Sequence, residues 1–153
     1  MSNSIDNTDR AILKLLQNDA TLSVDVLAEA VHLSRNACWR RVKRLEQTGV
    51  LRARVALVDP SKVGLGQLVF VLMRAADHSP DWLKAFDHAV QTLPEITGAH
   101  RMSGDLDYVL RVQVADVVDY DRFYKRLISM VPVRDISASF VMENIKDSTA
   151  LPV

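Results

Sequence analysis

The segment 27–51, LAEAVHLSRNACWRRVKRLEQTGVL, contains most of one amphipathic helical pattern, which starts just before it, and the whole of a second, separated by a break of a few residues. The first follows the capping residue Ser23, and its apolar face consists of Val24, Leu27, Ala28 and Val31. The second follows Ser34 and ends at Gln47, before Gly49, with an inward face of Cys38, Val42 and Leu45. Two short helices joined by a tight turn predict a helix-turn-helix.

Basic residues gather in the second of these helices and just after it. The whole chain is neutral, with 19 basic and 19 acidic residues. Residues 35–54 nevertheless contain only one acid, Glu46, and seven basic residues: Arg35, Arg40, Arg41, Lys43, Arg44, Arg52 and Arg54. A local excess of six positive charges predicts a polyanionic partner, double-stranded DNA.

The start of a recognition helix reaches the base edges in the major groove. We therefore expect Arg35 to pair with guanine and Asn36 with adenine, whereas residues further along meet phosphates. The predicted DNA-binding residues are Ser34, Arg35, Asn36, Trp39, Arg40, Lys43 and Arg44. The alternative is a solvated basic face, and Trp39 fits either the helix-pair core or the sugar-phosphate backbone.

The flanking sequence extends this unit in both directions. Upstream, a helix is predicted over about 9–17, with an apolar face of Ala11, Ile12, Leu15 and Leu16. Downstream, the alternation in 50–58 favours a strand, on which Arg52 and Arg54 form a small wing or are merely solvated. We expect a helix-turn-helix domain over 1–58 and a hinge over 59–66, where Gly64 and Gly66 lie.

The second half changes to a pattern of short strands and helices. Strands are predicted at 68–73, 96–102, 108–114 and 133–142, and helices at about 80–92 and 119–129. The order β-α-β-β-α-β is the ferredoxin-like arrangement. The expected fold class is α+β, with a winged helix-turn-helix followed by a ferredoxin-like domain over 67–153.

Composition excludes several classes of protein. Cys38 is the sole cysteine, so neither an internal disulfide nor a cysteine-cluster metal site can form, and its spacing favours a buried hydrophobe over a redox switch. The four histidines lack ligand spacing, so we expect no metal and no other cofactor. We find no nucleophile–base pair or phosphate loop and expect no enzyme. Without a signal peptide or a 20-residue apolar run, we expect a cytoplasmic protein that does not enter the membrane.

Three motifs carry a resemblance to a known family: segment 27–51, LVDPSKVGLG at 57–66, and RMSGDLDYVLRV at 101–112. In this order and spacing the chain resembles the Lrp/AsnC (leucine-responsive/asparagine-regulator) family, from about residue 5 to its end. The resemblance implies a winged helix-turn-helix joined to a ligand-binding, dimerising α/β domain of the RAM type. It also implies dimers that assemble into tetramers or octamers, and a response to amino acids.

We therefore expect a sequence-specific transcriptional regulator modulated by a small amino acid. The alternative is a sequence-tolerant chromatin-organising protein without an effector. Such a protein needs broad positive charge, whereas residues 61–153 carry 10 basic and 12 acidic side chains.

The resemblance places the effector between subunits, at the turn 103–108. Backbone N–H groups of a glycine turn can hold a carboxylate, and Asp105 or Asp107 can pair with the ammonium. The predicted effector residues are Met102, Ser103, Gly104, Asp105, Asp107, Tyr108, Ser137 and Ser139. The alternative is a simple hairpin, in which Asp107 is a local hydrogen-bond acceptor and Tyr108 lies in the core.

Overall fold

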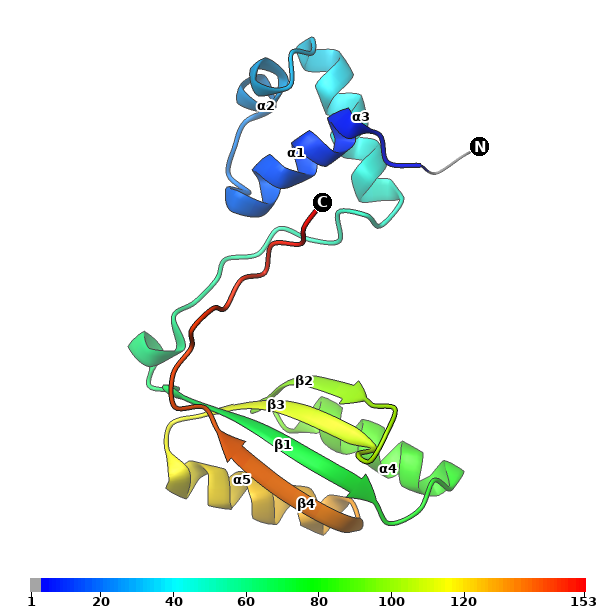
Figure 1. Cartoon of the computed structure of the whole chain (residues 1–153), viewed down its shortest axis with the longest axis vertical. Coiled ribbons are helices and arrows are strands. Elements are labelled where there is room, and N and C mark those ends of the chain that lie inside the picture. The colour runs from blue at the N-terminus through cyan, green and yellow to red at the C-terminus, as the bar shows by residue number, and fades with distance from the viewer. Residues whose placement is uncertain (1–3) are drawn as a thin grey trace. The chain divides into compact units, whose positions relative to one another are not determined.

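The computed structural model describes residues 4–153, which divide into two compact units (Figure 1). The first unit consists of Met1–Leu57 together with the C-terminal residues Lys146–Val153, and the second consists of Val58–Ile145. Three helices form the first unit, and a four-stranded sheet with two helices forms the second (Figure 1). The α+β class and the order of the two parts are as predicted.

The helices of the first unit are α1 (Asn7–Asn18), α2 (Val24–Ala30) and α3 (Arg35–Gln47). Each begins after a residue whose side chain accepts a backbone N–H from the first turn: Asp6, Ser23 and Ser34. The predicted caps Ser23 and Ser34 are confirmed. Helix α1 starts earlier than predicted, because Asp6 and Asp9 cap each other's backbone N–H groups in a capping box.

The three helices enclose one core, formed by Ile12, Leu13, Leu16, Leu27, Ala28, Cys38, Val42 and Leu45. The inward faces predicted for α2 and α3 are therefore confirmed in this core. On α1 the buried stripe includes Leu13, whereas the predicted Ala11 is exposed. The turn between α2 and α3 requires a positive φ of 55° at His32, which directs the chain into the recognition helix.

The predicted strand over 50–58 is wrong for this chain. After Gly49, which follows α3 with a φ of +73°, segment 50–58 belongs to no strand in the described residues. The alternating side chains Val55 and Leu57 are 69% and 73% exposed. A strand requires a hydrogen-bonded neighbour, and none is supplied to this segment within residues 4–153. The predicted wing with Arg52 and Arg54 is therefore not formed within the chain.

The second unit begins with a 3-10 helix, Pro60–Val63, inside the predicted hinge. Its remaining elements are β1 (Gln67–Ala75), α4 (Pro80–Thr92), β2 (Ile96–Arg101), β3 (Tyr108–Val114), α5 (Val117–Met130) and β4 (Val133–Phe140). The strands lie in the order β2-β3-β1-β4, and all neighbours are antiparallel. This is the predicted ferredoxin-like β-α-β-β-α-β topology.

Helices α4 and α5 cover one face of the sheet. Strand side chains such as Val71 and Leu110 are fully buried against Trp82 of α4 and Phe123 of α5. On the opposite face Phe70 is 38% exposed, and no helix of residues 58–145 covers it. Within residues 58–145 the sheet is therefore covered by helices on one face only.

The C-terminal residues return to the first unit, where they contact the end of α1. The side-chain amide of Gln17 donates to the carbonyl of Leu151 at 3.2 Å and accepts the N–H of Leu151 at 2.6 Å. The sequence interpretation kept these residues in the domain 67–153, because they show no periodicity that would connect them to α1.

Candidate DNA-binding surface and effector turn

The outward face of α3 is the candidate DNA-binding surface. Successive residues of a helix are rotated by about 100°, so Asn36, Arg40 and Lys43 lie opposite the buried face of Cys38, Val42 and Leu45. All three outward side chains are exposed. Trp39 is half-exposed, so its ring is not a core side chain of this unit. The sequence-predicted residues of α3 are thus brought together on one helix.

Folding places acidic side chains against several of these cations. Arg35 forms an exposed ion pair with Asp25 of α2 at 3.4 Å. Glu46 pairs with Lys43 at 2.8 Å and with Arg54 at 3.3 Å. Glu46 is already included in the excess of six positive charges counted over residues 35–54, but Asp25 is not, so its pairing with Arg35 lowers the local excess in the folded domain. No acidic side chain of residues 4–153 pairs with Arg40, which presents its full charge.

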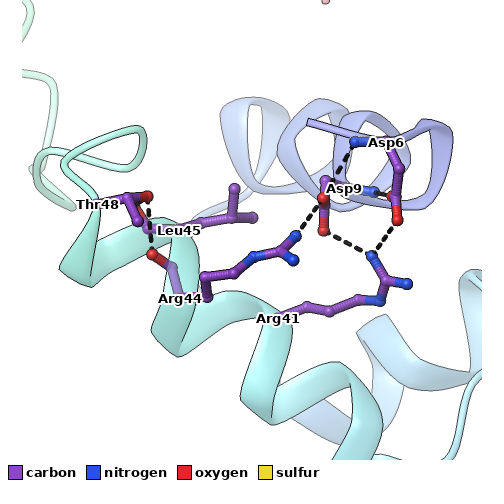
Figure 2. Close-up of polar contacts among 6 residues, drawn as sticks. All are labelled: Asp6, Asp9, Arg41, Arg44, Leu45 and Thr48. Atoms are coloured by element: carbon purple, nitrogen blue, oxygen red, sulfur yellow. Dashed lines mark hydrogen bonds and ion pairs between the residues drawn. The ribbon is translucent and has the colours of Figure 1, made fainter. Parts of the chain in front are cut away.

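An ion-pair network joins α1 to α3 (Figure 2). The Asp9 carboxylate is completely buried and accepts hydrogen bonds from Arg41, at 2.9 Å, and from Arg44. Arg41 also bonds Asp6 at 2.6 Å. Arg44, predicted to meet a phosphate, is therefore held to α1 by Asp9. Its backbone carbonyl accepts a hydrogen bond from the hydroxyl of Thr48, at the end of α3, at 2.8 Å (Figure 2).

The network also changes the protonation equilibria of its members. The pKa of Asp6 is lowered, first by the hydrogen bond from the Asp9 N–H and then by the one from Arg41. The pKa of Arg41 is raised by its hydrogen bonds to Asp6 and Asp9.

Burial raises the pKa of the Cys38 thiol, which lies fully inside the core. The interpretation of Cys38 as a buried hydrophobe fits this placement.

The turn between β2 and β3 carries most of the predicted effector residues. The N–H of Met102 donates to the carbonyl of Asp107 at 2.8 Å, which closes the hairpin. Gly104 has a φ of +118°, and a side chain added there meets nothing within 4 Å. The positive φ and the open space leave room for an anion beside Gly104, whereas the N–H groups of Met102 and Asp107 already donate to the carbonyls of Asp107 and Met73.

The two acids of the turn differ in what they bind. One carboxylate oxygen of Asp107 accepts the N–H of Ala75 at 2.8 Å, and the other lies 3.6 Å from Nε2 of His78. Asp107 therefore holds the turn to the end of β1. Asp105 is exposed, and its backbone carbonyl rather than its carboxylate accepts a hydrogen bond, from Nε of Arg74 at 2.7 Å. Among residues 4–153 no side chain or backbone group pairs with the Asp105 carboxylate, which leaves it available to a ligand.

The remaining predicted effector residues do not gather at the turn. The Tyr108 ring is buried, with its centroid 4.4 Å from that of Phe86, so it is a core side chain as the hairpin alternative expects. Ser137 and Ser139 are exposed on β4, in register with Leu72 and Phe70. At about 3.3 Å per residue, Ser139 lies further from the turn than Ser137.

Two residues beside the turn were missed by the sequence interpretation. Arg74 reaches from β1 to the Asp105 carbonyl and lies 3.4 Å from the carboxylate of Asp135 on β4. His78 lies beside Asp107. Arg74 is the only charged residue in the apolar run of β1, and that signal was available in the sequence.

Comparison with known proteins gives the same division of the chain. Residues 5–46 match the AsnC-type helix-turn-helix domain, and residues 68–151 match the Lrp/AsnC ligand binding domain. The chain belongs to the Lrp/AsnC family. It is a transcriptional regulator with a DNA-binding helix-turn-helix and a ligand-binding domain, as the resemblance of its three motifs implied.

Individual members of the Lrp/AsnC family are similar over nearly the whole chain. The DNA-binding transcriptional activator DecR of Escherichia coli K12 is 51% identical, over 97% of this chain and 99% of its own. An AsnC family transcriptional regulator from Agrobacterium tumefaciens has a TM-score of 0.92 and 52% identity, with 96% of each chain covered. A regulator from Neisseria meningitidis, solved in complex with L-Met, has a TM-score of 0.92 and 34% identity, with 97% of each chain covered.

Among residues 4–153, no three His, Cys, Asp or Glu side chains are grouped as a metal site requires. Within the same residues, no helix is long and apolar enough to cross a membrane.

Proposed function

We propose that this regulator reads its operator with the first turn of α3 and binds the DNA backbone with the basic side chains that follow in the helix. Arg35 and Asn36 are the base-reading residues, and Ser34, Trp39, Arg40 and Lys43 contact the sugar-phosphate backbone. Arg44 acts at the edge of this surface, because the buried Asp9 holds it.

One observation carries this assignment. The inward face of α3 is narrow, and the opposite face presents Asn36, Arg40 and Lys43 directly after a tight turn from α2. A helix with this division can enter a major groove without losing its own packing. A solvated basic helix of a non-DNA-binding domain does not require the tight turn from α2.

The test compares binding to a selected operator with binding to random duplex DNA over a range of salt concentrations. A sequence-specific regulator prefers its operator by roughly 10³-fold or more, and both affinities fall with salt. Equal affinity for the two duplexes would instead support the sequence-tolerant chromatin-organising alternative.

We further propose that a small amino acid is the effector and that it binds at the turn 102–107. Backbone N–H groups around Gly104 hold its carboxylate, and Asp105 takes its ammonium; Ser103 and Met102 border the ligand. Support comes from the free Asp105 carboxylate, from the ligand-binding domain match and from the L-Met complex of the Neisseria relative. Calorimetry with each of the twenty amino acids tests this proposal, and the absence of any heat of binding would contradict it.

We propose that the regulator is a homo-oligomer, a dimer that assembles further into a tetramer or octamer. Two features of the chain support this. Within the described residues 4–153, no helix covers the sheet face that exposes Phe70, and the segment around Val55 belongs to no strand. A second copy supplies both a covering face and a strand partner. Light scattering at micromolar concentration tests it, and a monomer would contradict it.

We place the regulator in the cytoplasm, where its DNA is, and assign it no catalytic role and no cofactor other than the effector. Cell fractionation with a chromosomal tag tests the location.

A further inference from the structure

An open pocket of about 330 Å³ lies beside the recognition helix. Its lining is Leu33, Ala37, Arg40, Arg41 and Arg44. The four α3 residues among these follow the spacing i, i+3, i+4 and i+7, so they form one flank of the helix. Three arginine side chains therefore line a single space at the protein surface.

The charges around this pocket do not balance. Arg41 and Arg44 share the buried carboxylate of Asp9, and Arg41 also pairs with Asp6. Within residues 4–153 no carboxylate pairs with Arg40. Three cations thus face two carboxylates, which leaves one positive charge beside the pocket. A phosphodiester carries one negative charge and several acceptor oxygens, so its chemistry complements the pocket.

The carboxylates leave the arginines able to donate further hydrogen bonds. A guanidinium has five N–H donors. Arg41 uses Nη1 for both of its acceptors, and Arg44 uses Nη2 for Asp9. The remaining donors are held in place by a carboxylate that cannot move, because Asp9 is fully buried. A side chain fixed in this way loses little conformational entropy when it binds a ligand.

We propose that this pocket binds one backbone phosphate of the DNA, with Arg40 as the direct contact and Asp9 as the residue that positions Arg41 and Arg44. The inference rests on the proposed DNA-binding function and deepens it. Arg40 belongs both to this pocket and to the outward face that it shares with Asn36 and Lys43, so a phosphate in the pocket borders the recognised groove. Such a contact fixes the register of α3 on the duplex.

Operator duplexes with a single neutral methylphosphonate at successive positions test this proposal. For the wild type we expect a roughly tenfold loss of affinity at one phosphate of each half-site. Arg40→Ala loses a similar factor on unmodified DNA, loses nothing more at that methylphosphonate, and lowers the salt slope by about one. Asp6→Asn, which lies at an exposed position, weakens the contact with that same phosphate. The variant keeps its preference for operator over random DNA. The control, Arg122→Ala on α5, behaves as the wild type.

Other results overturn the assignment. If the loss of affinity from Arg40→Ala adds to the loss from the methylphosphonate at every position tested, Arg40 contacts no single phosphate. Wild-type DNA affinity in folded Asp6→Asn and Asp9→Asn would show that the carboxylates position nothing used in binding. Arg40-dependent binding of inorganic phosphate together with a flat methylphosphonate scan would assign the pocket to a free anion. If the wild type and Arg122→Ala both fail to bind DNA, the proposed function falls as well.

Discussion

Asp9 of α1 and Arg44 of α3, 35 residues apart in the sequence, form an ion pair in which the carboxylate is completely buried. Arg41 is the second partner of the same carboxylate. The recognition helix is therefore fixed to α1 by charge as well as by its apolar face. Since an uncompensated buried charge is costly, this pair makes the position of α3 depend on α1.

Asp9→Ala should destabilise the first unit by about 2–3 kcal/mol. Removing one partner of a buried pair costs more than this, but Arg41 and Arg44 are partly exposed, so solvent screens the charges that remain. Chemical denaturation followed by circular dichroism measures the loss. The matched control is Asp25→Ala, which breaks an exposed pair with Arg35 and should cost less than 1 kcal/mol. Similar losses in the two variants would contradict a special role for Asp9.

Acid should weaken the first unit partly through Asp6. Its pKa in the folded protein lies below the ordinary value of 3.8, because the Asp9 N–H and then Arg41 stabilise the carboxylate. A group with a lowered folded pKa contributes stability above its unfolded pKa, and that stability is lost as pH falls through the folded value. The free energy of unfolding of the first unit should therefore decrease as the pH is lowered below about 4.

Asp6→Asn isolates this effect, because asparagine also caps helices but carries no charge. We expect the variant to show a shallower loss of stability below pH 4 than the wild type, as measured by urea unfolding at successive pH values. Parallel curves for the two proteins in that range would exclude Asp6 as a contributor.

Arg35→Ala should relax base preference and cost roughly 1–3 kcal/mol on the operator, since a bidentate contact to guanine is lost. Lys43→Ala should weaken operator and random DNA alike and reduce the salt slope. Fluorescence anisotropy with both duplexes separates the two effects. Asp25→Ala is an informative companion because it frees Arg35 from its ion pair and leaves the operator preference in place. Equal losses on both duplexes for Arg35→Ala would contradict base reading.

Phe70→Glu should shift the proposed oligomer toward the monomer, because it places a charge on the sheet face that no helix of residues 58–145 covers. Leu83→Glu on α4 is the matched control, since Leu83 is an apolar side chain of similar exposure on a helix. Light scattering at several concentrations measures the change. If Leu83→Glu dissociates the protein and Phe70→Glu does not, subunits associate through α4 instead.

Sequence patterns predicted those elements whose signals are local. Tyr108–Val114 was placed to the residue because its alternation is strict, and α3 because Ser34 and Gly49 mark its ends. The same alternation misled at 50–58, since a strand also needs a partner and residues 4–153 supply none to that segment.

The candidate sites were predictable in part for the same reason. The cations of α3 stand together in the sequence, so their clustering needed no structure. The pairing of Arg44 with Asp9 arises from the packing of α1 on α3, which has no local signature. Likewise, only the fold shows that the Asp107 carboxylate accepts the N–H of Ala75, whereas the Asp105 carboxylate has no partner among residues 4–153.

The two acids of the effector turn should respond differently to substitution. Asp105→Ala should abolish the binding of an amino acid with little change in thermal stability, because its carboxylate holds no other group of the turn. Asp107→Ala should lower the melting temperature without ligand, because the N–H of Ala75 loses its acceptor. Thermal shift with and without each amino acid measures both effects. A stability loss in Asp105→Ala as large as in Asp107→Ala would reverse the two roles.

Gly104→Leu should abolish the response to the amino acid and leave effector-free DNA affinity nearly intact, because the side chain fills the open space where the ligand binds. Gly64→Leu is the matched control: Gly64 also has a positive φ, +77°, and open surroundings, but it lies at the end of the 3-10 helix. The control also forces a side chain onto a backbone of positive φ, and it should keep the response. An effector that contacts two subunits couples to DNA by about 1–3 kcal/mol, or 5–150-fold in affinity. An amino acid that stabilises wild type and Gly104→Leu equally would place the effector site elsewhere.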